Sequence, residues 1–325
     1  MTQTNEPDSI DSGEALVRVR AVGICGTDIH AFHGTHPFIG YPRILGHELG
    51  VEIVEIGPNS QGLAAGDRCA IEPYLTCGQC TACRRDLTNC CTDLRCIGVH
   101  VDGGMRDLIR HPIDKLHRSR TLGVDQLALI ETLGIGKHAV DRSAVQPGDS
   151  VAVLGLGPIG MTVIQFAVLR GATVRGIDLS DDRCRKAQEL FQIETLPLRL
   201  NEPLTKQWCD HFDVPPRMVF DATGNLHSMQ NAFDLPDSGG TLVSVGVVVG
   251  DLCYNVPEFH RKELTLRASR NATGPDFHQI IDLVEQNKIN LDPWITHRGE
   301  AESLPEFFPA WITPEAGMLK GMICF

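Results

Sequence analysis

Four cysteines in the first third of the chain have the spacing of a metal site. They form a C-x2-C-x2-C-x7-C run at Cys77, Cys80, Cys83 and Cys91. Three thiolates at every third position wrap round one ion, and a fourth completes the tetrahedral shell of Zn²⁺. A disulfide cluster is the alternative, but the chain starts without a secretory signal and its other cysteines are scattered. The run therefore predicts a closed, structural zinc site with no open position for chemistry.

A glycine-rich turn has the sequence of a site for the diphosphate of a dinucleotide. It joins the predicted strand Ser150–Leu154 to a helix predicted over Pro158–Arg170. The first glycine permits a tight turn, the second lets the backbone approach the pyrophosphate, and the third lets the helix pack closely on the strand. The helix N-terminus adds N–H donors and the positive end of a dipole. The predicted cofactor-binding residues of this G-x-G-x-x-G turn are Gly155, Gly157, Pro158, Ile159 and Gly160.

An acidic residue near the end of the next predicted strand, Thr173–Leu179, indicates which dinucleotide is bound. Asp178 lies 23 residues after Gly155. A carboxylate at this place accepts hydrogen bonds from the adenosine ribose and repels a 2′-phosphate, so NAD is favoured over NADP. Alternatively, Asp178 caps the helix predicted over Asp181–Phe191. Arg183, also assigned to the cofactor site, would bind a 2′-phosphate, lie along the adenine or point into solvent.

The elements that must position these motifs fall into two domains. Up to about Glu131 the chain is rich in Gly, Pro and short β-like runs, which indicates an irregular, mostly β domain. After residue 149 strands and helices alternate, which predicts a doubly wound parallel sheet. A helix over Pro275–Asn287 and a mixed tail, Leu291–Phe325, are expected to follow and return to the first domain. The predicted strands not yet named are Ala15–Val22, Gly50–Ile56, Arg217–Ala222, Thr241–Val248 and Glu263–Ala268.

Length, charge and hydropathy narrow the class of protein. A chain of 325 residues accommodates two domains, and 42% hydrophobic with 22% charged residues is ordinary for a globular enzyme. A formal net charge of −12 argues against a nucleic-acid partner, because phosphates require a basic surface. No apolar run has the length of a membrane span, and the polar, acidic start lacks the pattern of a signal peptide. With reduced, metal-binding cysteines, these features predict a cytoplasmic protein without a membrane partner.

Two less conspicuous segments carry potential ligands for a second metal ion. Cys25 lies in Gly23–His30 and His47 in Gly46-His47-Glu48, each beside glycine turns. A single cysteine or histidine is more often a core or structural residue, so each segment alone indicates little. Together with the cysteine run, the segment Glu131–Ala139 and the glycine-rich turn, in this order and spacing, they resemble the zinc-dependent medium-chain alcohol and polyol dehydrogenases. The resemblance runs from about Glu14 to the end of the chain.

The resemblance implies a fold and a domain division. Residues 1–132 would form a GroES-like catalytic domain with the structural zinc lobe at about 77–91. Residues 133–273 would form a Rossmann dinucleotide-binding domain, and residues 274–325 would return to the catalytic domain. Family members carry an additional opening strand before the segment that matches Glu14–Val22, whereas only Met1–Gly13 precede it here. An absent strand would leave its neighbour with an unpaired edge.

The resemblance also implies two zinc ions per chain, one structural and one catalytic. The catalytic ion would be bound by Cys25, His47 and Glu131, where family members have a cysteine or an acid as third ligand. Glu48 would be the nearby carboxylate that approaches the ion or replaces the water at the fourth position. In the structural site the family spacing selects Cys91 rather than its neighbour Cys90.

Other residues around the catalytic ion would orient a ligand or handle the substrate hydroxyl and its proton. Asp28 would orient the imidazole of His47, as metal-bound histidines require, although it could simply cap a helix. Thr27 would hydrogen-bond the substrate hydroxyl, and His30 would pass its proton towards solvent, although His30 could be an ordinary surface residue. Zinc as a Lewis acid favours the alkoxide of a bound alcohol, which is the form that gives up hydride.

The implied function is NAD-dependent oxidation of a secondary hydroxyl in a polyol or sugar acid such as gulonate or galactonate. The segments that carry this closer resemblance are Gly98–Gly104, Glu131–Gly136 and Ser269–Thr273. A simple secondary-alcohol or threonine-type dehydrogenase of the same family is the alternative. The alternatives of other classes are a zinc ribbon for nucleic acid, which the acidic charge disfavours, and a non-catalytic protein that binds NAD and zinc. A homodimer or homotetramer is expected by analogy, with Glu263–Ala268 pairing across a two-fold axis.

Overall fold

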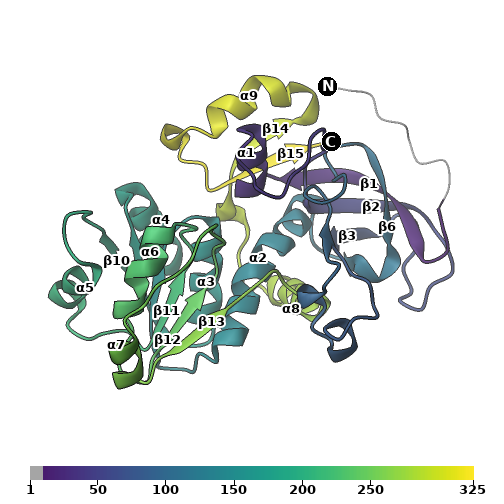
Figure 1. The fold of residues 1–325 in the computed structure, drawn as a ribbon. Coiled ribbons are helices and arrows are strands. Elements are labelled where there is room, and N and C mark those ends of the chain that lie inside the picture. Colours follow the sequence, from purple (N-terminus) through teal and green to yellow (C-terminus); the bar gives the residue numbers. More distant parts are fainter. Residues whose placement is uncertain (1–9) are drawn as a thin grey trace. The chain divides into compact units, whose positions relative to one another are not determined.

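The computed structural model describes residues 10–325, which form two compact units (Figure 1). Unit 1 comprises the chain up to Gly134 together with Ala272–Phe325, and unit 2 comprises Ile135–Asn271. The sequence predicted boundaries at 132/133 and 273/274. The predicted peculiarity of Met1–Gly13 falls largely outside the described residues. Within the described chain, no helix combines the length and apolarity needed to cross a membrane.

Unit 1 is built on a seven-stranded sheet with the order β14-β15-β1-β2-β3-β7, in which β6 also pairs with β1. Strand β1 alternates between buried and half-buried residues, and its buried side chains Val17 and Val19 enter the core of the unit. A separate two-stranded ribbon is formed by β4 and β5. The strands are β1 Glu14–Gly23, β2 Glu48–Ile56, β3 Arg68–Ile71, β4 Tyr74–Leu75, β5 Arg95–Cys96, β6 Leu108–Pro112, β7 Leu116–Ser119, β14 Ile295–Glu300 and β15 Lys320–Cys324.

Helices of unit 1 carry several of the predicted site residues. The short α1, Gly26–Phe32, directly follows Cys25, and two 3-10 turns, Cys83–Arg85 and Thr88–Cys90, shape the cysteine run. The long helix α2, Val124–Ser143, crosses the boundary between the units. The remaining helices of unit 1 are α8 Gly274–Glu285 and α9 Leu304–Trp311.

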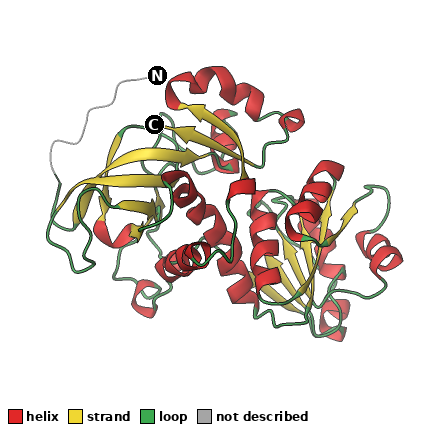
Figure 2. Cartoon of the chain, turned by 180° about the vertical axis from the view of Figure 1, so that it is seen from behind, coloured by secondary structure: helices red, strands yellow, loops and turns green. Residues whose placement is uncertain are grey.

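Unit 2 is a doubly wound α/β domain, as predicted. Its six parallel strands have the order β10-β9-β8-β11-β12-β13, and helices cover both faces of the sheet (Figure 2). This is the order of the dinucleotide-binding Rossmann fold. The strands are β8 Ser150–Leu154, β9 Thr173–Asp178, β10 Glu194–Pro197, β11 Met218–Asp221, β12 Thr241–Ser244 and β13 Thr265–Ala268. The helices are α3 Pro158–Leu169, α4 Asp181–Phe191, α5 Leu204–Phe212, α6 Leu226–Asn231 and α7 Val256–Arg261.

Most predicted elements of unit 2 are confirmed, with a few differences. Strand β12 ends at Ser244, because the backbone beyond it turns at Gly246. The pair β10 and α5 was not predicted, and β10 adds to the edge of the sheet beside β9. The predicted tail returns to unit 1, where β15 pairs with β1 and β14 pairs with β15.

Candidate functional site

The sulfurs of the four-cysteine run converge on one point. All four Sγ atoms of Cys77, Cys80, Cys83 and Cys91 lie within 4.8 Å of one another. Neighbouring sulfurs are 3.5 Å apart in two pairs, Cys80–Cys83 and Cys77–Cys91. Tetrahedral sulfurs at a Zn–S distance of 2.3 Å would be about 3.8 Å apart. The donor set and its dimensions therefore fit one zinc ion, while Cys90 is exposed and outside the group.

Backbone N–H groups also point at these sulfurs. Cys77 N donates to Cys91 Sγ at 3.3 Å, and Cys80 N donates to Cys77 Sγ at 3.4 Å. Such contacts stabilise thiolate charge, and the pKa of Cys80 is lowered to about 5, chiefly by backbone N–H donors. The pKa of Cys91 is also lowered, chiefly by the backbone N–H of Cys77, whereas burial raises the pKa of Cys83 to about 12. Backbone donors therefore favour the thiolate, the form that binds zinc, at two of the four positions.

A second convergence of metal-binding groups brings together residues from two segments of unit 1. One ligand atom each of Cys25, His47 and Glu48 lies within 4.8 Å of the others. Cys25 precedes α1, and Glu48 is the first residue of β2. His47 is buried, and its Nδ1 has no hydrogen-bond partner. A buried imidazole nitrogen without a partner is costly in protein alone and is the group that a metal ion would satisfy.

Glu48 is held in a buried ion pair. Lys320 Nζ lies 2.7 Å from both carboxylate oxygens of Glu48 and donates to the Ile24 carbonyl at 3.2 Å. The two paired side chains are each 1% exposed. Gly23 provides the space, because a Cβ at this position would lie 2.2 Å from Glu48 Oε2. Burial raises the pKa of Glu48, but the charge of Lys320 outweighs it and the pKa is lowered, so the carboxylate is ionised.

Glu131 lies in α2 and is not in that compact group, although the resemblance implied it as third ligand. Its Oε1 accepts a short hydrogen bond from the hydroxyl of Tyr74. Both residues are buried, at 5% and 3% exposure. Burial raises the pKa of Glu131, and the charge of His47 opposes that shift, so the carboxyl lies near the other ligand residues. Two buried carboxylates, Glu48 and Glu131, therefore border Cys25 and His47.

Asp28 takes the alternative role given from the sequence, that of a helix cap, and also contacts the segment that carries His47. The expected hydrogen bond to the imidazole of His47 is not present, because Asp28 accepts from Cys25 N at 2.9 Å and from Gly46 N at 3.3 Å. Asp28 thus caps α1 and ties together the backbone beside both ligands. Burial lowers the pKa of His47, but Cys25 and Asp28 outweigh burial and raise it well above its usual value. Metal binding at this imidazole therefore requires release of a proton.

The two residues expected to handle the substrate proton lie on α1. Thr27 is half-buried and His30 is exposed. His30 Nδ1 lies 3.2 Å from Thr35 Oγ1. Thr27 and His30 are about one helical turn apart on the chain, so their side chains lie on the same side of α1.

The glycine-rich turn of unit 2 has the close contacts that its sequence predicts. Gly155 has a φ of +86°, and a Cβ there would lie 2.9 Å from Thr223. A Cβ on Gly160 would lie 1.8 Å from the Gly155 carbonyl oxygen, so only glycine allows the helix to pack against the turn. Gly157 is the N-cap of α3, and Pro158 occupies its first turn. No Cβ contact restricts Gly157, which leaves its surface open to a ligand.

Asp178, the last residue of β9, is oriented by the same turn. Its Oδ2 accepts from Leu156 N at 2.7 Å and its Oδ1 from Ser180 N at 2.9 Å. Arg183 Nη1 lies 3.7 Å from Asp178 Oδ2, and the Arg183 side chain is 58% exposed. Ser180, not Asp178, is the N-cap of α4 and accepts from Arg183 N. The carboxylate is therefore positioned beside the turn rather than used as a helix cap.

Comparison with known proteins decides the family. The alcohol dehydrogenase GroES-like domain matches residues 11–121, and the zinc-binding dehydrogenase domain matches residues 158–286. Over 96% of its length the chain is 40% identical to L-galactonate-5-dehydrogenase of Escherichia coli, of which it covers 92%. The chain belongs to the zinc-dependent alcohol dehydrogenase family. This dehydrogenase is accordingly an oxidoreductase acting on CH–OH groups.

Two further likenesses extend the comparison. The dehydrogenase is 30% identical to the sorbitol dehydrogenase of Halalkalibacterium halodurans, with 87% of this chain and 84% of the relative covered. Its structure superposes on the alcohol dehydrogenase rspB of Escherichia coli, solved with NADH, with a TM-score of 0.91 at 26% identity. That match covers 99% of this chain and 94% of the other.

Three residues that border the metal-ligand groups of the dehydrogenase were missed from sequence. Lys320 binds the carboxylate of Glu48, and the Tyr74 hydroxyl donates to the carboxylate of Glu131. Cys96 is buried, and the charges of His47, Glu131 and Cys25 act on the pKa of its thiol. Lys320 is a single lysine within the apolar run of the last strand, and this pattern in the sequence could have indicated a buried ion pair. Tyr74 and Cys96 carried no comparable signal.

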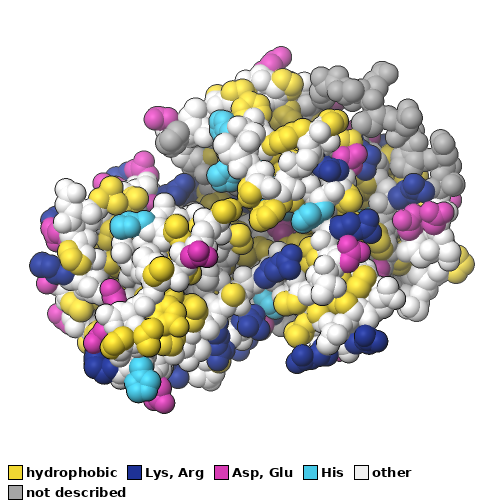
Figure 3. Space-filling view, viewed as in Figure 1, with side chains coloured by type: hydrophobic (Ala, Val, Ile, Leu, Met, Phe, Trp, Pro, Cys, Tyr) yellow, Lys and Arg dark blue, Asp and Glu magenta, His cyan; other side chains and the backbone are white. Residues whose placement is uncertain are grey.

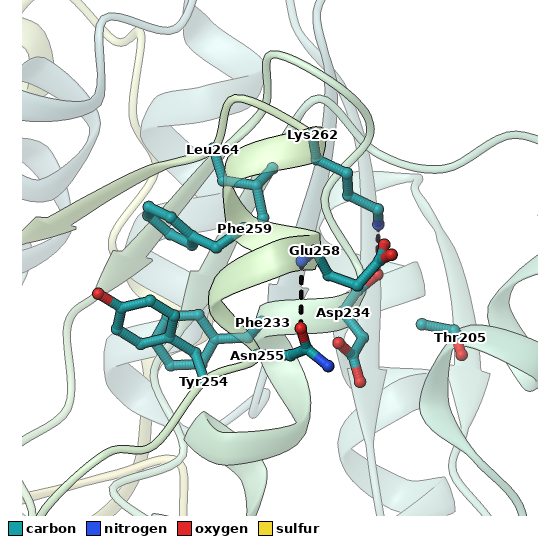
Figure 4. A pocket seen from close by; sticks show the side chains of 9 residues that line it. All are labelled: Thr205, Phe233, Asp234, Tyr254, Asn255, Glu258, Phe259, Lys262 and Leu264. Atoms are coloured by element: carbon teal, nitrogen blue, oxygen red, sulfur yellow. Dashed lines mark hydrogen bonds between the residues drawn. The ribbon is translucent and has the colours of Figure 1, made fainter.

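A cavity of about 350 Å³ lies elsewhere, within unit 2 (Figure 4). Its apolar wall is formed by Phe233, Tyr254 and Phe259, with Phe233 and Tyr254 stacked at 5.4 Å between ring centroids. Lys262, at its rim, donates to the carbonyls of Asp234 and Pro236. None of the predicted site residues lines this cavity, and we assign it no part in the reaction.

Proposed function

We propose that the protein is an NAD-dependent zinc dehydrogenase that oxidises a secondary hydroxyl of a sugar acid or polyol. The observation that carries the proposal is the convergence of Cys25, His47 and Glu48, with the buried carboxyl of Glu131 close enough for the charge of His47 to act on its pKa. A thiolate, an imidazole and a carboxylate are each ligands that zinc accepts, and three protein ligands leave the fourth position open for water or substrate. Cys25, His47 and Glu131 would hold the ion, with Glu48 beside it.

A zinc ion at this place would favour the alkoxide of a bound alcohol. The chain's own residues would handle the proton and the charge. Thr27 would hydrogen-bond the reacting hydroxyl, and the exposed His30 would hold its proton at the protein surface. Asp28 would keep Cys25 and His47 in register through its bonds to the backbone of both segments.

Histidines near His47 support a substrate with many hydroxyl groups. Burial lowers the pKa of His36, and the charges of His30, His100 and His47 act in the same direction, so these rings lie near one another. His100 Nδ1 accepts from Cys96 N at 3.0 Å, and His36 Nδ1 accepts from Phe38 N at 3.3 Å. An imidazole whose Nδ1 accepts carries its proton on Nε2 when neutral. The likeness to a galactonate dehydrogenase and a sorbitol dehydrogenase supports the same substrate class.

NAD is the proposed cofactor because Asp178 places a carboxylate where a 2′-phosphate would lie. Its two oxygens are fixed by Leu156 N and Ser180 N, so the charge cannot easily move away. A cytoplasmic location is proposed with it, since all twelve cysteines are unpaired thiols.

A second copy of the chain is the proposed partner, seated on the edge strand β13. Among the described strands it pairs with β12 alone, and Leu266 on it is 44% exposed. Val247, Val249 and Val256 nearby in the sequence are 75%, 76% and 63% exposed. Hydrophobic side chains gather on the face of unit 2 around α7 (Figure 3). An unpaired edge beside exposed apolar residues is a surface that a second strand would cover. Light scattering of wild type and Leu266→Lys would test this, with a monomeric variant expected.

The proposed activity is tested by metal analysis and a screen of substrates. Two zinc ions per chain and reduction of NAD by aldonates or sugar alcohols are expected. Cys25→Ser should keep the fold and lose the activity, whereas Cys209→Ser, an exposed thiol on α5, should leave it unchanged. One zinc per chain and no turnover would instead indicate a non-catalytic relative.

A further inference from the structure

The four-cysteine lobe and the second metal-ligand group share a structural element, the β4–β5 ribbon. In it Tyr74 pairs with Cys96 and Leu75 with Arg95. Cys77 follows Leu75 by two residues, and Cys91 precedes Arg95 by four. The contact between Cys77 and Cys91, at 3.5 Å between sulfurs, therefore ties the two arms of the ribbon together.

The ribbon is too short to be stable alone. Each of its strands has two residues, and isolated two-stranded hairpins are at best marginally stable in water. A hydrogen bond from Ile97 N to the Pro73 carbonyl at 3.1 Å also joins its two arms, and Leu75 and Ile97 pack in the core of unit 1. Closure of the cysteine lobe is thus one of the restraints on where Tyr74 and Cys96 lie.

Each strand of the ribbon leads towards a residue that is proposed to hold the second metal ion. From β4, the Tyr74 hydroxyl donates to Glu131 Oε1. From β5, the chain continues to Gly98, where a Cβ would lie 2.9 Å from the Gly46 carbonyl, directly before His47. Gly103 N and Gly104 N then donate to the carbonyls of residues 44 and 46, at 2.8 and 2.9 Å.

The Tyr74 hydroxyl is suited to orient Glu131. Tyr74 is 3% exposed, and a buried phenol that donates to a carboxylate fixes the direction of that carboxylate. With Oε1 engaged by Tyr74, Oε2 would be the oxygen left to bind a metal ion. Hydrogen-bond partners of metal ligands commonly change metal affinity by about 10- to 100-fold when removed.

We propose that Tyr74 is a positioning residue for Glu131, and that the four-cysteine lobe, by holding the β4–β5 ribbon, sets the metal affinity of the Cys25–His47–Glu131 site. The proposal rests on the proposed function in that these three residues hold a metal ion. The structural zinc would then support the second metal site as well as the local fold.

The test compares metal affinity in variants of the full chain. Tyr74→Phe removes only the hydroxyl, and Tyr41→Phe is a matched control, because Tyr41 Oη also donates a hydrogen bond in unit 1, to the Ala31 carbonyl at 2.7 Å. The second site is emptied, refilled with Co²⁺ and titrated against a chelator, with the visible absorption of the Co²⁺ as the readout. Tyr74→Phe should weaken binding by about 10- to 100-fold, with Tyr41→Phe unchanged.

The link to the lobe is tested by combining changes. Cys80→Ser, which removes one lobe ligand, should weaken Co²⁺ binding at the second site in wild type but by less than about twofold in Tyr74→Phe. If Cys80→Ser does not fold, Cys80→His is used instead, because histidine is also a zinc ligand. It should weaken Co²⁺ binding in the same pattern, but by a smaller factor than the serine variant.

Unchanged Co²⁺ affinity in Tyr74→Phe, or an equal effect of the Cys80 change in both backgrounds, would overturn the proposal. A wild-type protein that binds a single metal ion would overturn the proposed function instead. The two failures are therefore distinguishable.

Discussion

Replacing Lys320 by Met tests whether the buried ion pair with Glu48 stabilises unit 1. Lys320 Nζ lies 2.7 Å from both oxygens of Glu48, and each side chain is 1% exposed. Methionine fills a similar volume without the charge. The change therefore leaves an ionised, buried carboxylate without its partner and removes the donor to the Ile24 carbonyl.

The expected loss follows from the burial of the pair. At 2.7 Å and an effective dielectric constant of about 20, the attraction is about 6 kcal/mol, part of which is offset by the cost of desolvating both charges. Removing one partner of such a pair typically destabilises by about 3–5 kcal/mol. For a unit of this size that corresponds to a decrease in Tm of about 10 °C. Lys288→Met, at an exposed lysine of unit 1, should change stability by less than about 0.5 kcal/mol.

The assay is chemical denaturation followed by the fluorescence of Trp294 and Trp311, both in unit 1, in metal-free and zinc-loaded protein. The loss should be smaller with zinc, because a cation beside Glu48 replaces part of the missing charge. Adding Glu48→Gln to Lys320→Met should recover a large part of the loss, since no unpaired charge remains. A metal-free Lys320→Met protein within about 1 kcal/mol of wild type would refute the reasoning.

Three further predictions concern other groups. Burial lowers the pKa of His111 to about 4, so between pH 6.5 and 4 the unfolded chain binds a proton that the folded chain does not, and stability falls as pH falls, by up to about 3 kcal/mol. His111→Gln, which can still donate to the Glu72 carbonyl, should lose that slope in denaturation curves across this range. Asp178→Ser should raise kcat/KM with NADP relative to NAD by at least about tenfold, and an unchanged ratio would contradict its proposed role. Gly160→Ala should lower kcat/KM by about 100-fold, since its Cβ would lie 1.8 Å from the Gly155 carbonyl oxygen and displace the turn; wild-type kinetics would contradict the packing argument.

The parts of the fold that could be predicted are those specified by local pattern. Strand β8, the helix after it and the cap at Ser180 follow from apolar runs, glycine spacing and a serine before acidic residues. The start of helix α2 was not predicted, although Glu131 lies within this helix, seven residues after its first residue, Val124. Its first turn has Gly123 before it and no apolar periodicity strong enough to mark the boundary.

The site was predictable only where residue type and spacing coincide. Cys77, Cys80 and Cys83 lie within seven residues of one another, so their convergence is a property of one loop. The pairs that hold the second group are distant, with 57 residues between Tyr74 and Glu131 and 272 between Glu48 and Lys320. Such contacts depend on how strands are ordered in the sheet, and a single sequence does not contain that order.

Charge balance indicates how the two buried carboxylates divide their roles. Cys25 as thiolate and Glu131 as carboxylate together carry two negative charges, which match one Zn²⁺ beside a neutral His47. Glu48 would add a third negative charge to this buried group, but Lys320 cancels it at 2.7 Å. Among the described residues Glu131 is hydrogen-bonded by the neutral hydroxyl of Tyr74, and burial raises its pKa, so its negative charge is the one that a cation would stabilise most. The arrangement therefore favours Glu131 as the ligand and Glu48 as its paired neighbour, a division that the single charge on Lys320 decides.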